Sequence, residues 1–177
     1  FIKIILLLLK HIPVSKKKYN NLEIKFVGNY KNNLKLFKNI LTENSVLNER
    51  NFTGQLNRKD VLKILTQSDI FVFASSSETF GITLLEGMAI GMPIVCSNKS
   101  SLPEILDNSG LYFDPEKDLQ LSKKIDLLIR NKKLRKIKSE QAKKAALKFS
   151  WENNTNQFSN LINKLIKNYN LENEKKY

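Results

Sequence analysis

Residues 69–97 have the sequence DIFVFASSSETFGITLLEGMAIGMPIVCS, and this stretch decides the fold. Its first part, residues 69–74, is rich in β-branched and aromatic residues, which is typical of a strand. A second apolar run, residues 93–97, begins at Pro93, which is tolerated at the first position of a strand because no donor is needed there. The residues from Gly81 to about Gly91 favour a helix. The stretch therefore predicts a strand–helix–strand unit.

The same alternation extends to both sides of this unit. We expect further strands at residues 22–27, 50–53 and 110–113, and helices at 31–44, 57–67, 116–130, 132–147 and 150–168, with Asn57 as an N-cap. Strands and helices at this spacing predict an α/β fold, a doubly wound, Rossmann-like parallel sheet with helices on both faces. We expect one domain over residues 1–168, followed by a polar tail at 169–177.

The chain opens with the apolar run FIKIILLLL, and we interpret residues 1 to about 17 as a buried helix. The run is too short to span a bilayer, and no cleavage site of a signal peptide follows it. A doubly wound sheet normally opens on a central strand. A chain that opens on a helix therefore predicts a missing first strand, between those at 22–27 and 69–74, and a domain truncated at its N-terminus.

The charge balance raises the question of a polyanionic partner. Lys and Arg outnumber Asp and Glu by 30 to 17, which gives a formal net charge of +13. The excess is mostly lysine on predicted helix faces, and no nucleic-acid recognition motif accompanies it. We therefore expect no nucleic-acid partner. The single cysteine, Cys96, lies in an apolar run and His11 has no ligand-like neighbours, which is consistent with a reducing, cytoplasmic compartment.

The loop after the predicted strand at 69–74 is the strongest candidate for a binding site. Ligands of open parallel sheets bind at the carboxyl ends of the strands. Here the loop leads through Gly81 into a helix, whose N-terminus offers unpaired backbone N–H groups and a partial positive charge. Gly81 allows a ligand to approach the backbone closely. The pattern predicts a phosphate site that needs no side chain.

Two glutamates bracket this turn, and each has two interpretations. From the helix, Glu86 could accept hydrogen bonds from a vicinal diol such as a ribose, and Glu78 could face the group beyond the phosphate. Alternatively, Thr83-Leu-Leu-Glu86 and Ser75-Ser-Ser-Glu78 each fit a capping box, in which the glutamate only satisfies a backbone N–H. Taken alone, either short pattern is more typical of a cap than of a ligand site.

The arrangement as a whole resembles the signature of the retaining glycosyltransferases of family 4, the group 1 transferases. Their pattern has two glutamates around a Phe-Gly turn, a helix of small residues, Gly-x-Pro and a buried strand. Other blocks agree in order: residues 22–28, 51–54, 68–72, 101–105 and the Phe-Ser-Trp at 149–151. The resemblance implies the C-terminal, donor-binding domain of a two-Rossmann-domain (GT-B) enzyme. Such an enzyme transfers a sugar from a nucleotide-diphosphate sugar with retention of anomeric configuration.

The resemblance also implies a role for each matching position. Glu86 would hold the donor ribose, and Glu78 would lie near the transferred sugar as the catalytic candidate. The implied donor-binding positions are the backbone of Phe80, Gly81, Ile82 and Thr83 for the sugar and diphosphate, Gln55 and Leu56 for the nucleobase, and Gly28 for close approach. No cofactor is implied. The chain has no Asp-x-Asp pair, so we expect no metal.

The sequence departs from the family in two ways. Tyr30 stands where relatives often have a second glycine, and Ala74 where they usually have proline. Relatives also carry a basic loop upstream of the position of Phe1 and an N-terminal domain that binds the acceptor, a glycan or lipid-linked glycan. Without these, we expect this chain alone to be inactive. The full protein is expected in the cytoplasm, with peripheral association at the inner face of the membrane as an option.

Three other functions are alternatives to sugar transfer. A nicotinamide or flavin enzyme would need Gly-x-Gly-x-x-Gly after its first strand, and the residues after Gly28 do not supply it. Another sugar-nucleotide enzyme of the same architecture, such as an epimerase, stays open. A basic, non-enzymatic nucleic-acid-binding domain has the charge but no motif, and a steep salt dependence of binding would reveal it.

Overall fold

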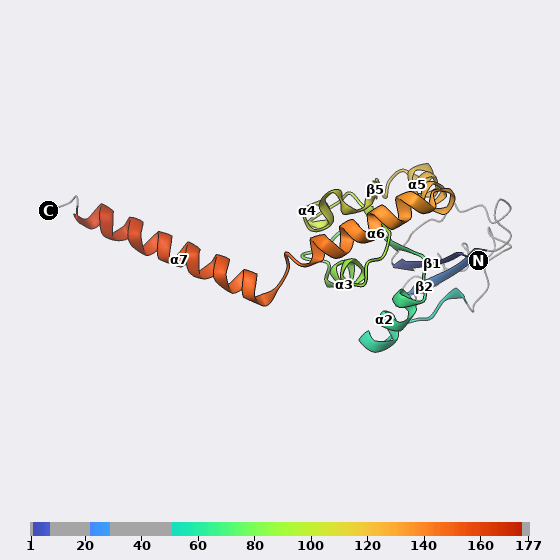
Figure 1. The fold of residues 1–177 in the computed structure, drawn as a ribbon, viewed down its shortest axis with the longest axis horizontal. Coiled ribbons are helices and arrows are strands. Elements are labelled where there is room, and N and C mark those ends of the chain that lie inside the picture. The colour runs from blue at the N-terminus through green and yellow to red at the C-terminus, as the bar shows by residue number, and fades with distance from the viewer. Residues whose placement is uncertain (1, 8–21, 29–50, 175–177) are drawn as a thin grey trace.

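The computed structural model describes residues 2–7, 22–28 and 51–174 of the chain (Figure 1). Its strands form one parallel sheet with the order β2-β1-β3-β4-β5. The strands are β1 (Ile2–Leu7), β2 (Leu22–Val27), β3 (Ile70–Phe73), β4 (Ile94–Ser97) and β5 (Leu111–Phe113). The strand order reverses between β1 and β3, which makes the carboxyl ends of these two strands the expected ligand position. The predicted doubly wound α/β fold is confirmed.

The prediction for the start of the chain is wrong for residues 2–7, which form β1 rather than a helix. β1 pairs along its whole length with β2 and, from Ile4↔Ile70 to Leu7↔Phe73, with β3. It lies where the first strand was predicted to be missing, so the expected gap in the sheet does not exist. Periodicity cannot separate a buried helix from a buried strand in a short apolar run, and the isoleucines of this run favour a strand.

The helices described are α2 (Arg58–Thr66), α3 (Ile82–Ile90), α4 (Leu102–Leu106), α5 (Asp118–Arg130), α6 (Lys132–Ala146) and α7 (Trp151–Glu174), with a 3-10 turn, η4, at Asp107–Ser109. Alternate side chains of β3 belong to two hydrophobic clusters, one on each face of the sheet. Phe71 and Phe73 pack with residues of α2, α3, α4 and α6, whereas Ile70 and Val72 pack with residues of α5. Helices therefore cover both faces, as predicted.

Two further sequence predictions differ from the structure. Residues 50–53 were expected to form a strand, but residues 51–53 form only an isolated bridge, Phe26↔Phe52, beside which the Thr53 backbone N–H donates to the Phe26 oxygen at 2.9 Å. The chain turns away at Gly54, whose φ of 70° ends the extended backbone, before it enters α2. The last helix continues through Glu174, past the predicted end at residue 168. The predicted helix at 31–44 lies outside the described residues.

The small residues of α3 allow this helix to lie close against the sheet. A Cβ atom at Gly87 would lie 2.5 Å from Cδ1 and 2.7 Å from Cε1 of the Phe71 ring, which is too close for any side chain. Gly87 is itself buried, as are Leu84 and Met88 of the same helix. The close contact fixes the position of α3 relative to the carboxyl end of β3, where the candidate site lies.

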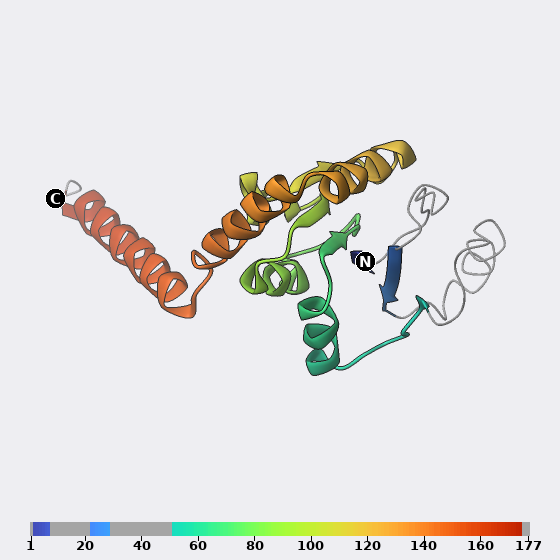
Figure 2. The same cartoon turned by 45° about the vertical axis from the view of Figure 1, so that its right-hand side comes forward.

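The last helix leaves the body of the domain. Figures 1 and 2 show α7 projecting away from the sheet and its covering helices. As expected from Phe149-Ser150-Trp151, α7 begins at Trp151, and the Ser150 side chain accepts a hydrogen bond from the backbone N–H of Asn153 at 3.1 Å. No helix within residues 2–7, 22–28 and 51–174 is long and apolar enough to cross a membrane.

Candidate donor-binding site

The turn between β3 and α3 leaves the N-terminus of α3 open. Gly81 is the N-cap, with a left-handed φ of 73°, and it provides no side-chain hydrogen bond to the helix. The first backbone N–H groups of a helix have no acceptor within the helix, and here no cap side chain supplies one. Phe80 and Ile82, on either side of Gly81, are 42% and 66% exposed. The structure thus has the open helix N-terminus that the sequence predicted for a phosphate group.

Neither glutamate forms the capping box that competed with a binding role. Thr83 lies inside α3, because the helix begins at Ile82, and its side chain therefore cannot serve as the N-cap. No helix begins after Ser75, whose hydroxyl instead donates to the backbone oxygen of Ser77 at 3.1 Å. The capping interpretation of Glu78 and Glu86 is wrong, and the two carboxylates require another explanation.

Glu86 is held by a partner that the sequence analysis did not identify. Its side chain is 13% exposed, and Arg58 Nε donates to Glu86 Oε1 at 2.6 Å. Arg58 is the first residue of α2, so this ion pair joins the N-terminal turn of α2 to the second turn of α3. The sequence contains little that could have identified this pair. Arg58 follows the predicted cap Asn57, but no periodicity links it to Glu86, which is 28 positions away.

Glu78 is fixed through its backbone and not through its carboxylate. The Ser100 hydroxyl donates to the backbone oxygen of Glu78 at 2.5 Å and accepts from the Glu78 N–H at 3.3 Å. The Ser101 hydroxyl donates to the same oxygen at 3.2 Å. Among the described residues, the Glu78 carboxylate has no hydrogen bond or ion pair. The loop after β4 therefore holds the loop after β3 and leaves this carboxylate available.

The predicted loop glycine and the predicted nucleobase segment are neighbours. Gly28 follows β2, has a φ of 137°, and donates its backbone N–H to the Gly54 oxygen at 3.0 Å. A Cβ atom at Gly28 would meet nothing within 4 Å, so the backbone conformation and not crowding requires glycine. Gln55 and Leu56 connect Gly54 to the cap of α2, with Gln55 exposed and Leu56 packed on the core. Tyr30 lies outside the described residues.

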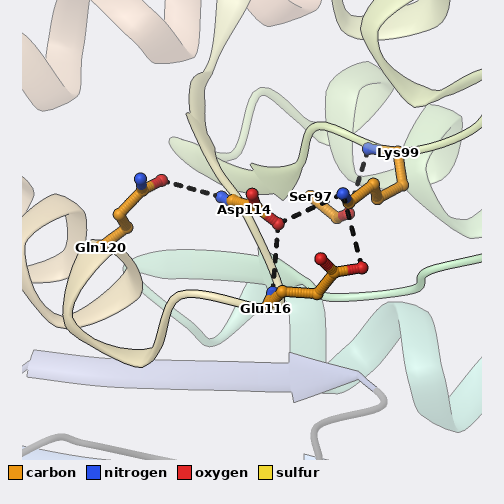
Figure 3. A network of polar contacts seen from close by, with 5 residues as sticks. All are labelled: Ser97, Lys99, Asp114, Glu116 and Gln120. Carbon is orange, nitrogen blue, oxygen red and sulfur yellow. Dashed lines mark hydrogen bonds and ion pairs between the residues drawn. The ribbon is translucent and has the colours of Figure 1, made fainter.

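A second group of charged residues lies after β4 and β5 (Figure 3). Lys99 Nζ lies 3.3 Å from Asp114 Oδ1 and 3.6 Å from Glu116 Oε1. The hydrogen bond to Asp114 raises the pKa of Lys99, and the hydrogen bond from the Glu116 backbone N–H lowers the pKa of Asp114. The Gln120 side chain accepts from the Asp114 N–H at 2.9 Å. The Asp114 carboxylate is therefore occupied by groups of the protein itself, whereas the Glu116 side chain is 79% exposed.

The remaining reactive groups do not add to the site. Cys96 is fully buried in β4, as predicted, and burial raises the pKa of its thiol to about 12. A thiol with so high a pKa is a poor nucleophile at neutral pH. Within the part of the chain that the structure describes, no three His, Cys, Asp or Glu residues are grouped to hold a metal ion. Metal-independent chemistry stays a prediction.

The sheet is open and parallel, and its carboxyl edge carries an uncapped helix N-terminus and a carboxylate fixed by an ion pair. Rossmann-like proteins that bind nucleotides have this arrangement. Residues 3–145 match the model of the family described as glycosyl transferases group 1, and the chain belongs to this family. The predicted group 1 membership is confirmed.

Individual relatives agree with this family. Over 109 residues the chain is 35% identical to O-antigen chain mannosyltransferase B of Escherichia coli, covering 62% of this chain and 29% of that protein. Its fold is similar to that of Anabaena HepE in complex with UDP, with a TM-score of 0.70, 17% identity and coverage of 92% and 48% of the two chains. It is also similar to the C-terminal domain of the group 1 family protein LpcC from Francisella tularensis, with a TM-score of 0.64, 19% identity and coverage of 82% and 84%. The chain thus spans less than a third of the E. coli relative and about half of HepE.

Proposed function

We propose that this chain is the donor-binding half of a retaining glycosyltransferase, and that its ligand is a nucleoside-diphosphate sugar. The observation that carries the proposal is the carboxylate of Glu86. It is 13% exposed, performs no capping function, and lies one turn beyond the open N-terminus of α3. A diphosphate at that N-terminus would be followed by a ribose near the second turn, where a carboxylate can accept from both hydroxyls.

Each part of the donor then has a counterpart in the chain. The backbone N–H groups of Phe80, Gly81, Ile82 and Thr83 bind the sugar and diphosphate, since these groups precede or begin α3. A helix N-terminus stabilises the negative charge that grows on the diphosphate as it leaves. The nucleobase lies against the backbone at Gln55 and Leu56, and Gly28 gives the donor room at the end of β2. UDP in HepE supports a ligand of this type.

The free carboxylate of Glu78 is assigned to the transferred sugar. Its backbone is fixed by Ser100 and Ser101, and among the described residues its side chain has no competing partner. A carboxylate there can accept from a sugar hydroxyl or stabilise positive charge that develops at the anomeric carbon. We further propose that transfer needs no metal, that the acceptor is a glycan or lipid-linked glycan bound by a domain outside this chain, and that the chain alone transfers nothing.

Glu86→Gln tests this assignment directly. Calorimetric titration of the 177-residue chain with UDP and with GDP should show binding of at least one, and Glu86→Gln should weaken it by about 1.5–3 kcal/mol, the contribution of a hydrogen bond to a charged group. Glu140→Gln is the matched control, because it removes the same charge from an exposed position of α6. Equal binding by the wild-type chain and Glu86→Gln, or no binding by the wild type, would contradict the proposed function.

A further inference from the structure

The placement of Arg58 is not explained by the helix that carries it. Arg58 is the first residue of α2, where the partial positive charge of the helix disfavours a cation. The N-terminus of α2 is capped without it: the Asn57 side chain accepts from the Asp60 N–H at 3.0 Å and donates to the Asp60 carboxylate at 2.7 Å. Arg58 therefore adds nothing to the cap and occupies an electrostatically unfavourable position.

Its contact with Glu86 also contributes little to folding. The Arg58 side chain is 77% exposed, whereas that of Glu86 is 13% exposed. An ion pair with one partner so exposed to water is strongly screened, and such pairs typically add little stability. The contact distance of 2.6 Å between Arg58 Nε and Glu86 Oε1 nevertheless fixes one oxygen of the carboxylate.

We propose that Arg58 is a positioning residue of the donor site, which orients the Glu86 carboxylate for the ribose and stays in place when the donor binds. This rests on the proposed function of Glu86. A carboxylate offers about four lone-pair positions, so the bond from Arg58 leaves enough for both hydroxyls of a vicinal diol. The Oε2 atom has no partner among the described residues, and Arg58 restricts rotation of the group that must present both oxygens. A single orientation removes part of the entropy cost of binding.

The test is a double-mutant cycle on nucleotide binding by the 177-residue chain. Titrations use UDP and GDP, and the nucleotide that binds wild type more tightly is kept for all variants. We expect Arg58→Gln to weaken binding by about two- to fivefold, the range of an exposed ion pair, and Arg58→Lys to restore part of the loss. In the Glu86→Gln background the same Arg58→Gln change should have no effect, because Arg58 acts only through the carboxylate. Lys59→Gln removes the same charge from the next, exposed residue and should leave binding unchanged.

The cycle separates this proposal from the proposed function. If Glu86→Gln weakens binding but Arg58→Gln does not, Glu86 binds the donor without help from Arg58, and only the positioning role is lost. Tighter binding by Arg58→Gln would show that Arg58 blocks the site, which also overturns the proposal. An equal loss in both backgrounds would mean that Arg58 contacts the nucleotide itself. Melting temperatures of Arg58→Gln and wild type should agree within about 2 °C, since a change at an exposed position costs little stability.

Discussion

Two pairs of carboxylates lie at the carboxyl edge of the same sheet, and they differ in what surrounds them. Asp114 and Glu116, after β5, share the cation of Lys99, and Asp114 also accepts from the Glu116 backbone (Figure 3). Glu86 has Arg58 alone, and the Glu78 carboxylate has no partner among the described residues.

This difference separates carboxylates that stabilise the fold from carboxylates that can bind a ligand. A carboxylate whose acceptor positions are occupied by the protein contributes to folding, while one held in place but left with free acceptor positions can bind a ligand. Sequence position does not distinguish the pairs, since three of the residues lie in loops at the same edge and Glu86 lies in the second turn of the helix that follows one of these loops. Asp114 differs from the other carboxylates because it has two partners, the Lys99 cation and a backbone N–H, whereas Glu86 has one and Glu78 has none among the described residues. The following predictions change these contacts.

The largest effect is expected for Glu78→Gln. If its free carboxylate acts on the transferred sugar, the amide should lower the turnover of the full-length protein by about tenfold or more, as for loss of one charge-stabilising group at a reacting centre. Unfolding of the 177-residue chain in urea should be unchanged within about 0.5 kcal/mol, since no interaction of the protein is lost. Initial rates of sugar transfer measure the expected loss of turnover, and urea titrations measure the expected lack of change in stability. Unchanged turnover would remove Glu78 from the catalytic site.

A smaller effect is expected at Ser100, which holds the backbone of Glu78. Its φ of 58° is unfavourable for a residue other than glycine, so the two hydrogen bonds to Glu78 offset a strained conformation. Ser100→Ala keeps the strain and loses both bonds, and should destabilise the chain by about 0.5–1.5 kcal/mol. Ser100→Gly loses the bonds but relieves the strain, so its loss should be smaller. Urea unfolding of the two variants gives the comparison, and the reverse order would contradict this account of the loop.

The smallest effect is expected for the ion pair between Lys99 and Asp114, and it should depend on pH. The Asp114 pKa is lowered on folding, so its contribution to stability is present above the ordinary carboxyl pKa and is lost as the pH falls through the lowered value. The Lys99 pKa is raised, so its contribution is present below the ordinary lysine pKa and is lost as the pH rises through the raised value. Both contributions are therefore present from about pH 5 to pH 9.

Lys99→Gln should be slightly less stable than wild type in this window, and the difference should shrink toward both extremes of pH. Urea unfolding at a series of pH values measures it. Glu116→Gln, which changes the more exposed and more distant partner of Lys99, is the control and should differ less from wild type. Nucleotide binding should be the same in both variants. A loss of binding in Lys99→Gln would mean that this group also belongs to the donor site.

Local patterns in the sequence determined the elements around the site. The apolar runs at 70–73 and 94–97 formed strands and Asn57 capped α2, as expected. The open turn at Gly81 was also predictable, because it depends on residues within a few positions of one another. The family followed from the order of these same blocks.

Tertiary structure decided what local patterns could not. Ile2–Leu7 became a central strand because β2 and β3 pair with it on both sides, which no periodicity within so short an apolar run can show. The ion pair that holds Glu86 depended on Arg58, and the fixing of Glu78 on Ser100, both far away in sequence. Sequence determines helix, strand and cap through neighbouring residues, but the partner of a charged side chain is set by how separate elements pack, and only the folded chain brings those partners together.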